Sequence, residues 1–171
     1  MTAPETATAP VKLRVVRVGL LLALAVIAAA ASGAREGQTR LTPADIGAMA
    51  KGGAGAGTSG VAGIRTTVLS GDPTAAGPYT IEIRVPAHTR IAAHRHRDDR
   101  SAVVVSGTWW FGYGLHADDA LLKALAPGSF YTEPADVPHF AQTRDEPAVV
   151  YITGVGPTDT RYVDAATKRR P

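Results

Sequence analysis

The pattern of apolar positions divides this chain into two parts. Residues 18–31 form an unbroken run of Val, Leu, Ile and Ala with a single Gly. From Val61 onward, apolar residues occur in short segments separated by Gly, Pro and Asp. The clearest segment, Tyr79–Val85, alternates apolar and polar positions, which predicts a strand with one buried face. Short strands at roughly ten-residue spacing with turn signals between them predict an all-β sandwich or barrel.

The N-terminal apolar run has the features of a targeting segment. Three basic residues precede it, and the small residues of Ala30–Ala34 follow it. This order is typical of a secretory signal peptide. The run is shorter than the roughly 20 residues that a bilayer span needs. We therefore predict that residues 1–34 are a signal peptide and that the protein is exported, periplasmic or secreted. An uncleaved membrane anchor is the alternative.

By composition and apolar pattern, the remaining chain divides into a linker, a barrel and a tail. Residues 35–60 contain the glycine-rich run KGGAGAGTSG and are predicted to be a flexible linker. A short helix is predicted within Leu41–Met49, with Thr42 as N-cap and Pro43 at the first helical position. Residues 61–160 are predicted to form the barrel, and residues 161–171 a basic tail. Within the barrel, Asp118–Leu125 is predicted to be a short helical turn.

Composition and charge remove several classes of function. The chain has no cysteine, which excludes disulfides, thiolate metal sites and thiol nucleophiles. Its formal charge of +3 arises from 18 basic and 15 acidic residues. Residues 1–34 contain three of the basic residues and one of the acidic residues. The rest of the chain therefore has 15 basic and 14 acidic residues, a net charge of +1. A nearly neutral domain gives no electrostatic reason to expect nucleic-acid binding.

Three histidines are the strongest chemical signal in the chain. His94 and His96 are two positions apart on a predicted strand, so their side chains project from the same face. His139 begins another predicted strand about forty residues later. Neutral imidazole is the commonest protein ligand of metals, and three histidines leave coordination positions open for water or substrate. His88 and His116 fall in predicted loops and are interpreted as surface residues.

These histidines lie in two segments that resemble the motifs of the cupin superfamily. The first motif is Gly, five residues, His-x-His, three or four residues, Glu, six residues and Gly, and the chain matches it at His94, His96 and Gly107. The second motif is Gly, five residues, Pro-x-Gly, two residues, His, three residues and Asn, and the chain matches it at Gly128, Pro134 and His139. The resemblance covers about residues 64–154 and implies a single-domain, RmlC-like jelly-roll barrel. The segments Trp109–Gly114 and Gly71–Pro73 also resemble a group of secreted single-domain bacterial cupins.

The chain departs from both motifs at defined positions. His88 and Asp136 replace glycines, and both residue types are among those most often found at positive φ. Thr143 replaces the terminal Asn. Arg100 occupies the position of the glutamate that usually supplies a fourth metal ligand. A guanidinium cannot bind a cation and repels it.

Three interpretations of the site follow. In the first, His94, His96 and His139 hold Fe, Mn, Ni or Zn, among which imidazole does not discriminate, and Arg100 clamps an anionic substrate. Some cupins, such as the thiol dioxygenases, work with three histidines and no glutamate. In the second, Glu133, Asp98 or Asp99 supplies the missing carboxylate, although Glu133 can equally pair with Arg100. In the third, no metal binds, and the barrel holds a small organic ligand.

Two functions therefore remain open. The first is a metal-dependent enzyme, most readily an oxygenase acting on a small anionic or phenolic metabolite, with Arg100 and Glu133 as the residues acting beside the metal. The second is a non-enzymatic module that binds or senses a metal or metabolite. The aromatic cluster at Trp109, Trp110, Phe111 and Tyr113 is interpreted as core, with a pocket wall or a homodimer face as the alternative.

Overall fold

The computed structural model describes residues 37–53 and 55–164. Apart from Gly37, the described residues belong to a single compact unit, which lies within residues 38–171. The predicted signal or anchor segment and most of the predicted tail lie outside the described residues. Among the residues that are described, no helix is both long enough and apolar enough to cross a membrane.

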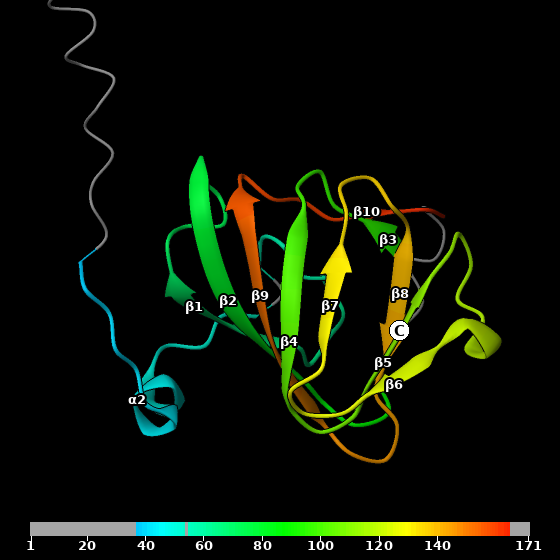
Figure 1. The fold of residues 1–171 in the computed structure, drawn as a ribbon, viewed down its shortest axis with the longest axis horizontal. Coiled ribbons are helices and arrows are strands. Elements are labelled where there is room, and N and C mark those ends of the chain that lie inside the picture. Colours follow the sequence, from blue (N-terminus) through cyan, green and yellow to red (C-terminus); the bar gives the residue numbers. More distant parts are fainter. Residues whose placement is uncertain (1–36, 54, 165–171) are drawn as a thin grey trace, which may run out of the picture. The chain divides into compact units, whose positions relative to one another are not determined.

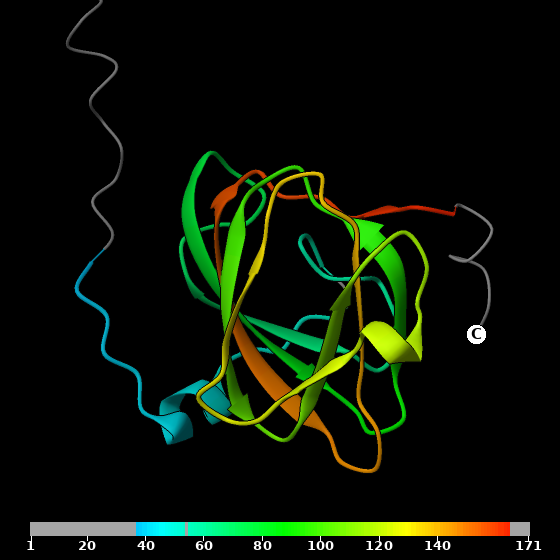
Figure 2. The ribbon, with the colours of Figure 1, turned by 45° about the vertical axis from the view of Figure 1, so that its right-hand side comes forward.

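The described unit is a two-sheet β-structure, as the strand pattern predicted (Figure 1). The first antiparallel sheet contains, in spatial order, β1 (Arg65–Ser70), β2 (Gly77–Val85), β9 (Ala148–Gly156), β4 (Arg100–Ser106) and β7 (Phe130–Glu133). The second contains β10 (Arg161–Tyr162), β3 (Arg90–Arg95), β8 (His139–Gln142), β5 (Trp109–Tyr113) and β6 (Lys123–Leu125). The turned view shows the two sheets facing each other around the core (Figure 2).

Strand β2 shows why the sequence folds in this way. Its alternating residues Tyr79, Ile81, Ile83 and Val85 are all buried in the core between the sheets. Burial of such side chains is worth roughly 1.5–3 kcal/mol each relative to exposure. The opposite face of β2 is more polar, and its Glu82 forms a two-pronged ion pair with Arg84. The predicted all-β class and the period-two pattern are therefore confirmed.

The predicted N-terminal helix is also present. Helix α2 (Pro43–Ala48) has Thr42 as its N-cap, and the Thr42 hydroxyl accepts a hydrogen bond from the Asp45 backbone N–H. The Asp45 side chain in turn accepts a hydrogen bond from the Thr42 backbone N–H, which completes a capping box. Ile46 is the buried residue of this helix.

The helical turn predicted at Asp118–Leu125 is present only in its first half. The structure has a three-residue 3₁₀ helix, η2 (Asp119–Leu121), followed directly by strand β6. The backbone of β6 pairs with β5, and Leu125 lies opposite Trp109. A single helical turn is not stable alone, so pairing with an existing sheet edge determines the conformation of residues 123–125.

The two residues that replace motif glycines have the backbone conformation that favours glycine, as predicted. His88 and Asp136 are the non-glycine residues that adopt positive φ within the described part of the chain, at 55° and 61°. Gly107 has a φ of 70°, and a Cβ there would lie 2.0 Å from the Pro147 carbonyl oxygen. These turns position the strand ends that carry the histidines.

Candidate metal centre

The three predicted histidines converge at one end of the second sheet. His94 in β3 lies directly opposite His139, the first residue of β8, and His96 follows β3 by one position. The ring centroids are 4.5 Å apart for His94 and His139, 5.0 Å for His94 and His96, and 5.1 Å for His96 and His139. One potential ligand atom from each residue lies within 4.8 Å of the others. All three side chains are buried.

Backbone carbonyls fix how each imidazole is oriented. The Nδ1 atom of His94 lies 2.8 Å from the carbonyl oxygen of Ala92, and that of His139 lies 3.1 Å from Val137. The Nδ1 atom of His96 lies 2.5 Å from the carbonyl oxygen of Asp159. A carbonyl oxygen only accepts hydrogen bonds, so each Nδ1 carries the hydrogen. The Nε2 lone pairs are therefore the atoms available to a ligand.

Burial keeps these histidines neutral. Loss of solvation lowers the pKa of His94 to about 3 and that of His96 to about 2. Burial also lowers the pKa of His139. The nearby Arg100 guanidinium acts in the same direction on all three. Neutral imidazole is the form that binds metals, so the site does not have to release protons in order to bind one.

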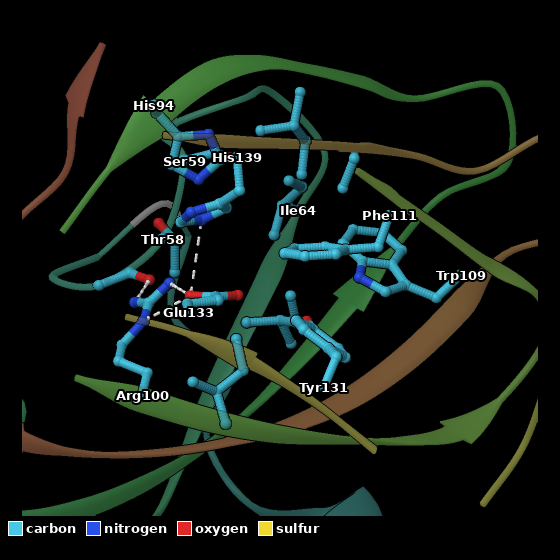
Figure 3. A pocket seen from close by; sticks show the side chains of 15 residues that line it. Thr58, Ser59, Ile64, His94, Arg100, Trp109, Phe111, Tyr131, Glu133 and His139 are labelled. Carbon is cyan, nitrogen blue, oxygen red and sulfur yellow. Dashed lines mark hydrogen bonds and ion pairs between the residues drawn. The ribbon is translucent and has the colours of Figure 1, made fainter. Parts of the chain in front are cut away.

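Glu133 brings a carboxylate to the same point from the other sheet. It ends β7 and lies directly opposite Arg100, the first residue of β4. Its Oε2 atom lies 3.6 Å from His139 Nε2 (Figure 3). The same oxygen lies 3.7 Å from His96 Nε2. Both distances are too long for hydrogen bonds.

Arg100 is paired rather than free. Its Nε donates to Glu133 Oε2 at 2.7 Å, and its Nη2 donates to the same oxygen. Its Nη1 donates to the Gly57 carbonyl oxygen at 2.7 Å. The ion pair between Arg100 and Glu133 is one of the alternatives that the sequence left undecided. The guanidinium is therefore held in place by protein acceptors, and it orients Glu133 instead of standing alone over the histidines.

The Arg100 partner keeps Glu133 ionised inside the protein. Burial alone would raise the pKa of this carboxyl group, but Arg100, with His139 and His96, lowers it to about 2. The pair contributes no net charge. The site thus offers three neutral imidazoles and one carboxylate whose charge is balanced by a fixed guanidinium.

The donor set fits a divalent transition metal. The Nε2 atoms of His96 and His139 are buried and have no hydrogen-bond partner among the described residues, and such atoms are rare without a ligand. Two ligand atoms on one tetrahedral metal with arms of about 2.1 Å lie roughly 3.4 Å apart. The distances from Glu133 Oε2 to the two histidines are close to this spacing. His94, His96 and His139 would hold the ion, with Glu133 beside them.

Comparison with known proteins identifies the fold. No family model matches the sequence, and no curated protein matches it. Among solved structures, the polyketide cyclase RemF from Streptomyces resistomycificus matches with a TM-score of 0.56 at 18% identity, over 75% of this chain and 87% of that chain. An RmlC-like cupin from Shewanella frigidimarina matches with a TM-score of 0.51 at 16% identity, over 71% of this chain and 93% of that chain. The fold is that of a cupin.

A further match covers only part of the matched protein. It is to a structure of DMSP lyases, RdDddP and RnDddQII, with a TM-score of 0.47 at 21% identity. It covers 55% of this chain, which spans about half, 48%, of that one. Identities at this level establish the fold alone, and the chemistry must be argued from the side chains of this cupin barrel.

Two of the histidines, His94 and His139, line a cavity inside the cupin barrel. The cavity is small, with a volume of about 30 Å³. The rest of its wall is apolar or aromatic (Figure 3), formed by Ile64, Ile83, Ile91, Trp109, Phe111, Tyr131, Ala141 and Ile152. Of the predicted aromatic core, Trp109 and Phe111 line this cavity, whereas Tyr113 is exposed.

Part of the glycine-rich segment lines the cavity, which the sequence did not indicate. Gly57, Thr58 and Ser59, here called the cover segment, line the cavity, and Thr58 and Ser59 are buried. Each of the three backbone carbonyls accepts a hydrogen bond from the barrel. The donors are Arg100 to Gly57, Thr160 to Thr58 at 2.7 Å, and Tyr162 to Ser59.

The other predicted residues lie apart from the histidine group. Asp98 accepts hydrogen bonds from Tyr79 at 2.8 Å and Thr158 at 2.6 Å, and Asp99 accepts one from the Ala135 backbone at 2.8 Å. Both carboxylates thus have structural partners. His88 and His116 are exposed, as predicted.

Proposed function

We propose that this cupin binds one divalent transition-metal ion through His94, His96 and His139 and acts on a small anionic molecule in the adjoining cavity. The observation that carries the proposal is the convergence of three neutral imidazoles, each with Nδ1 bound to a backbone carbonyl and Nε2 directed inward. A bound ion would supply Lewis acidity and an open coordination position.

The protein's own residues would prepare the site for that ion. The three carbonyls hold the imidazole rings in the tautomer that binds metal. Arg100 keeps Glu133 ionised and directs its Oε2 atom toward His96 and His139. The apolar wall keeps bulk water away from the reacting end of the cavity, which strengthens electrostatic interactions there.

The reaction class that we propose for the metal-loaded protein is oxygen-dependent oxidation of a small anionic metabolite. Three neutral histidine ligands with open positions suit Fe(II) as well as Zn(II), Mn(II) or Ni(II). The second candidate is a binding or sensing module. The observation that supports this second candidate is the paired Arg100, because its guanidinium is already engaged by Glu133 and Gly57.

Metal titration tests the site. The full chain, purified without a histidine tag and stripped with a chelator, is titrated with Zn(II) and Co(II) in competition with a chromophoric chelator. We expect one equivalent per chain, and His139→Ala should weaken binding by at least a hundredfold. His116→Ala, at an exposed histidine, is the matched control and should bind as the wild type does. Unchanged metal affinity in His139→Ala would refute the proposed site.

The same assay tests whether Glu133 supports the metal ion or only pairs with Arg100. If its carboxylate supports the ion, Glu133→Gln should weaken Co(II) binding about tenfold or more and alter the visible spectrum. Glu146→Gln, at an exposed carboxylate, is the control. An identical spectrum and affinity in Glu133→Gln would assign Glu133 to the Arg100 pair alone.

Oxygen uptake separates the enzyme from the binding module. The Fe(II)-loaded chain is tested in an oxygen electrode against a panel of small carboxylates and phenols. The oxygenase proposal predicts uptake that depends on one class of compound and is lost in His139→Ala. Tight metal binding with no uptake across the panel would favour the binding or sensing function.

Export remains part of the proposal, supported by the basic, apolar and small-residue order of residues 1–34. Expression in a bacterial host followed by N-terminal sequencing of the mature protein tests it. A new N-terminus near Ala31 or Ala34 is expected, and an intact N-terminus on a cytoplasmic protein would contradict it.

A further inference from the structure

The inner part of the cavity contains two buried hydrogen-bond donors that lack a partner. Trp109 in β5 is 2% exposed, and Tyr131 in β7 is 6% exposed. Within the described residues, neither the Trp109 Nε1 atom nor the Tyr131 hydroxyl makes a hydrogen bond. Most buried polar side-chain atoms in native proteins are paired, so two unpaired donors in one cavity wall call for an explanation.

The two donors lie close together and one ring away from the histidines. The Tyr131 hydroxyl lies close enough to the Trp109 indole and the Glu133 carboxylate for both groups to shift its pKa, but neither contact has the geometry of a hydrogen bond. The Phe111 ring centroid is 4.3 Å from that of Tyr131 and 5.4 Å from that of His139 (Figure 3). A ligand of a few atoms can therefore reach the donors and the histidine end at once.

The cavity's size and charge define what the donors can bind. Its volume of about 30 Å³ admits only a small ligand of a few non-hydrogen atoms. The histidines are neutral, and Arg100 balances Glu133, so a divalent ion would leave the cavity with a net positive charge. The wall around Trp109 and Tyr131 is aliphatic and aromatic, with Ile83, Ile91 and Ile152 lining the same cavity. A small anion with a short apolar part complements all of these features.

We propose that Trp109 and Tyr131 are the specificity-determining residues of this cavity. They recognise a short aliphatic carboxylate of one to three carbons, one oxygen of which accepts hydrogen bonds from the indole N–H and the phenol O–H. This inference rests on the proposed metal-binding function, whose ion supplies the attraction for the anion. It goes beyond that function by naming the ligand class and the residues that select it.

Conservative variants test the donors one at a time. Tyr131→Phe removes a hydroxyl and little else, and Trp109→Phe removes the indole N–H. Tyr113→Phe and Trp110→Phe are the matched controls, because Tyr113 is bound to the exposed Thr132 carbonyl and Trp110 lies under Arg144. Acetate, propanoate, hexanoate, benzoate and uncharged acetamide are titrated into the Co(II)-loaded full chain. The readouts are visible absorption for the loaded protein and tryptophan fluorescence for the metal-free protein.

We expect acetate and propanoate to bind, with hexanoate, benzoate and acetamide at least tenfold weaker. Tyr131→Phe and Trp109→Phe should each weaken acetate binding about tenfold, and the two controls should not. Thermal unfolding checks that each variant folds. If Trp109→Phe does not fold, the effect of Tyr131→Phe on acetate binding alone tests the proposal. Wild-type affinity in Tyr131→Phe, or no binding of any short carboxylate, would overturn the proposal.

The outcomes also separate this inference from the proposed function. A chain that binds Co(II) but whose acetate affinity is insensitive to Tyr131→Phe keeps the metal site and refutes the donor pair. A chain that binds no metal, yet shows an acetate-dependent fluorescence change that Tyr131→Phe abolishes, refutes the metal site and keeps the donor pair.

Discussion

Arg100 and Glu133 show how one residue changes the electrostatics of a site. The position that normally carries a carboxylate in the first cupin motif carries a guanidinium here, and the residue directly across the ladder carries the carboxylate instead. A carboxylate thus lies on the neighbouring strand and faces His96 and His139. The motif alone predicted a missing ligand, and the cross-strand register shows where a carboxylate is retained.

Removing Arg100 should destabilise the protein, because it leaves a buried carboxylate without its partner. Arg100→Met leaves the Glu133 carboxylate buried without its partner and should lower the free energy of unfolding by about 3 kcal/mol. The double variant Arg100→Met with Glu133→Leu should recover most of that loss. Arg90→Met, which breaks the exposed pair with Asp119, is the control and should change stability by less than about 1 kcal/mol. Urea unfolding measures all four proteins, and equal stability in Arg100→Met and wild type would contradict the pairing.

The buried histidines should make the metal-free protein sensitive to mild acid. The pKa values of His94 and His96 lie well below the unfolded value of about 6.5, so below pH 6.5 the unfolded chain binds protons that the folded chain does not. Stability is therefore complete above pH 6.5 and falls as the pH drops toward 3. The loss between pH 7.5 and 5.5 should be about 1.4 kcal/mol for each of these two histidines.

The same urea experiment at pH 7.5 and 5.5 checks this expectation. His94→Gln should reduce the loss, and His116→Gln should leave it unchanged. Glu133, with its pKa lowered to about 2, contributes only below about pH 4.5 and does not affect this window. An unfolding midpoint that is the same at both pH values would show that the histidines are not buried in neutral form.

At the scale of elements, the cover segment illustrates what a sequence pattern leaves out. A glycine-rich run has no periodicity, so it was interpreted as a flexible linker. Its carbonyls bind side chains located 43, 102 and 103 positions later in the chain. Such contacts leave no local signal. The strand β6 was missed for a related reason, because a distant strand edge overrides a weak helical preference.

The cover segment should open when its hydrogen-bond donors are removed. Thr160→Val and Tyr162→Phe together leave the Thr58 and Ser59 carbonyls without their partners, so amide exchange across residues 57–60 should become at least tenfold faster. Thr80→Val with Tyr113→Phe, at exposed hydroxyls elsewhere on the barrel, is the matched control. Exchange that is equally slow in both double variants would show that the three carbonyl contacts do not hold the segment.

At the scale of the whole molecule, the fold followed from sequence and the chemistry only in part. Alternating burial along β2 and the positive φ of His88 and Asp136 were predictable, because each depends on local pattern. The three histidines were predictable from two motifs. The small size of the cavity and its unpaired Trp109 and Tyr131 were not, because they depend on how the two sheets and the cover segment pack together.

The central claim is that this cupin barrel holds one metal ion on three histidine Nε2 atoms. Anomalous X-ray diffraction from crystals of the Co(II)-loaded chain, recorded on both sides of the cobalt absorption edge, tests it most directly. The account predicts one strong anomalous peak per chain, about 2.1 Å from the Nε2 atoms of His94, His96 and His139. A loaded crystal with no peak among these histidines, or with its peak at surface residues, would contradict it.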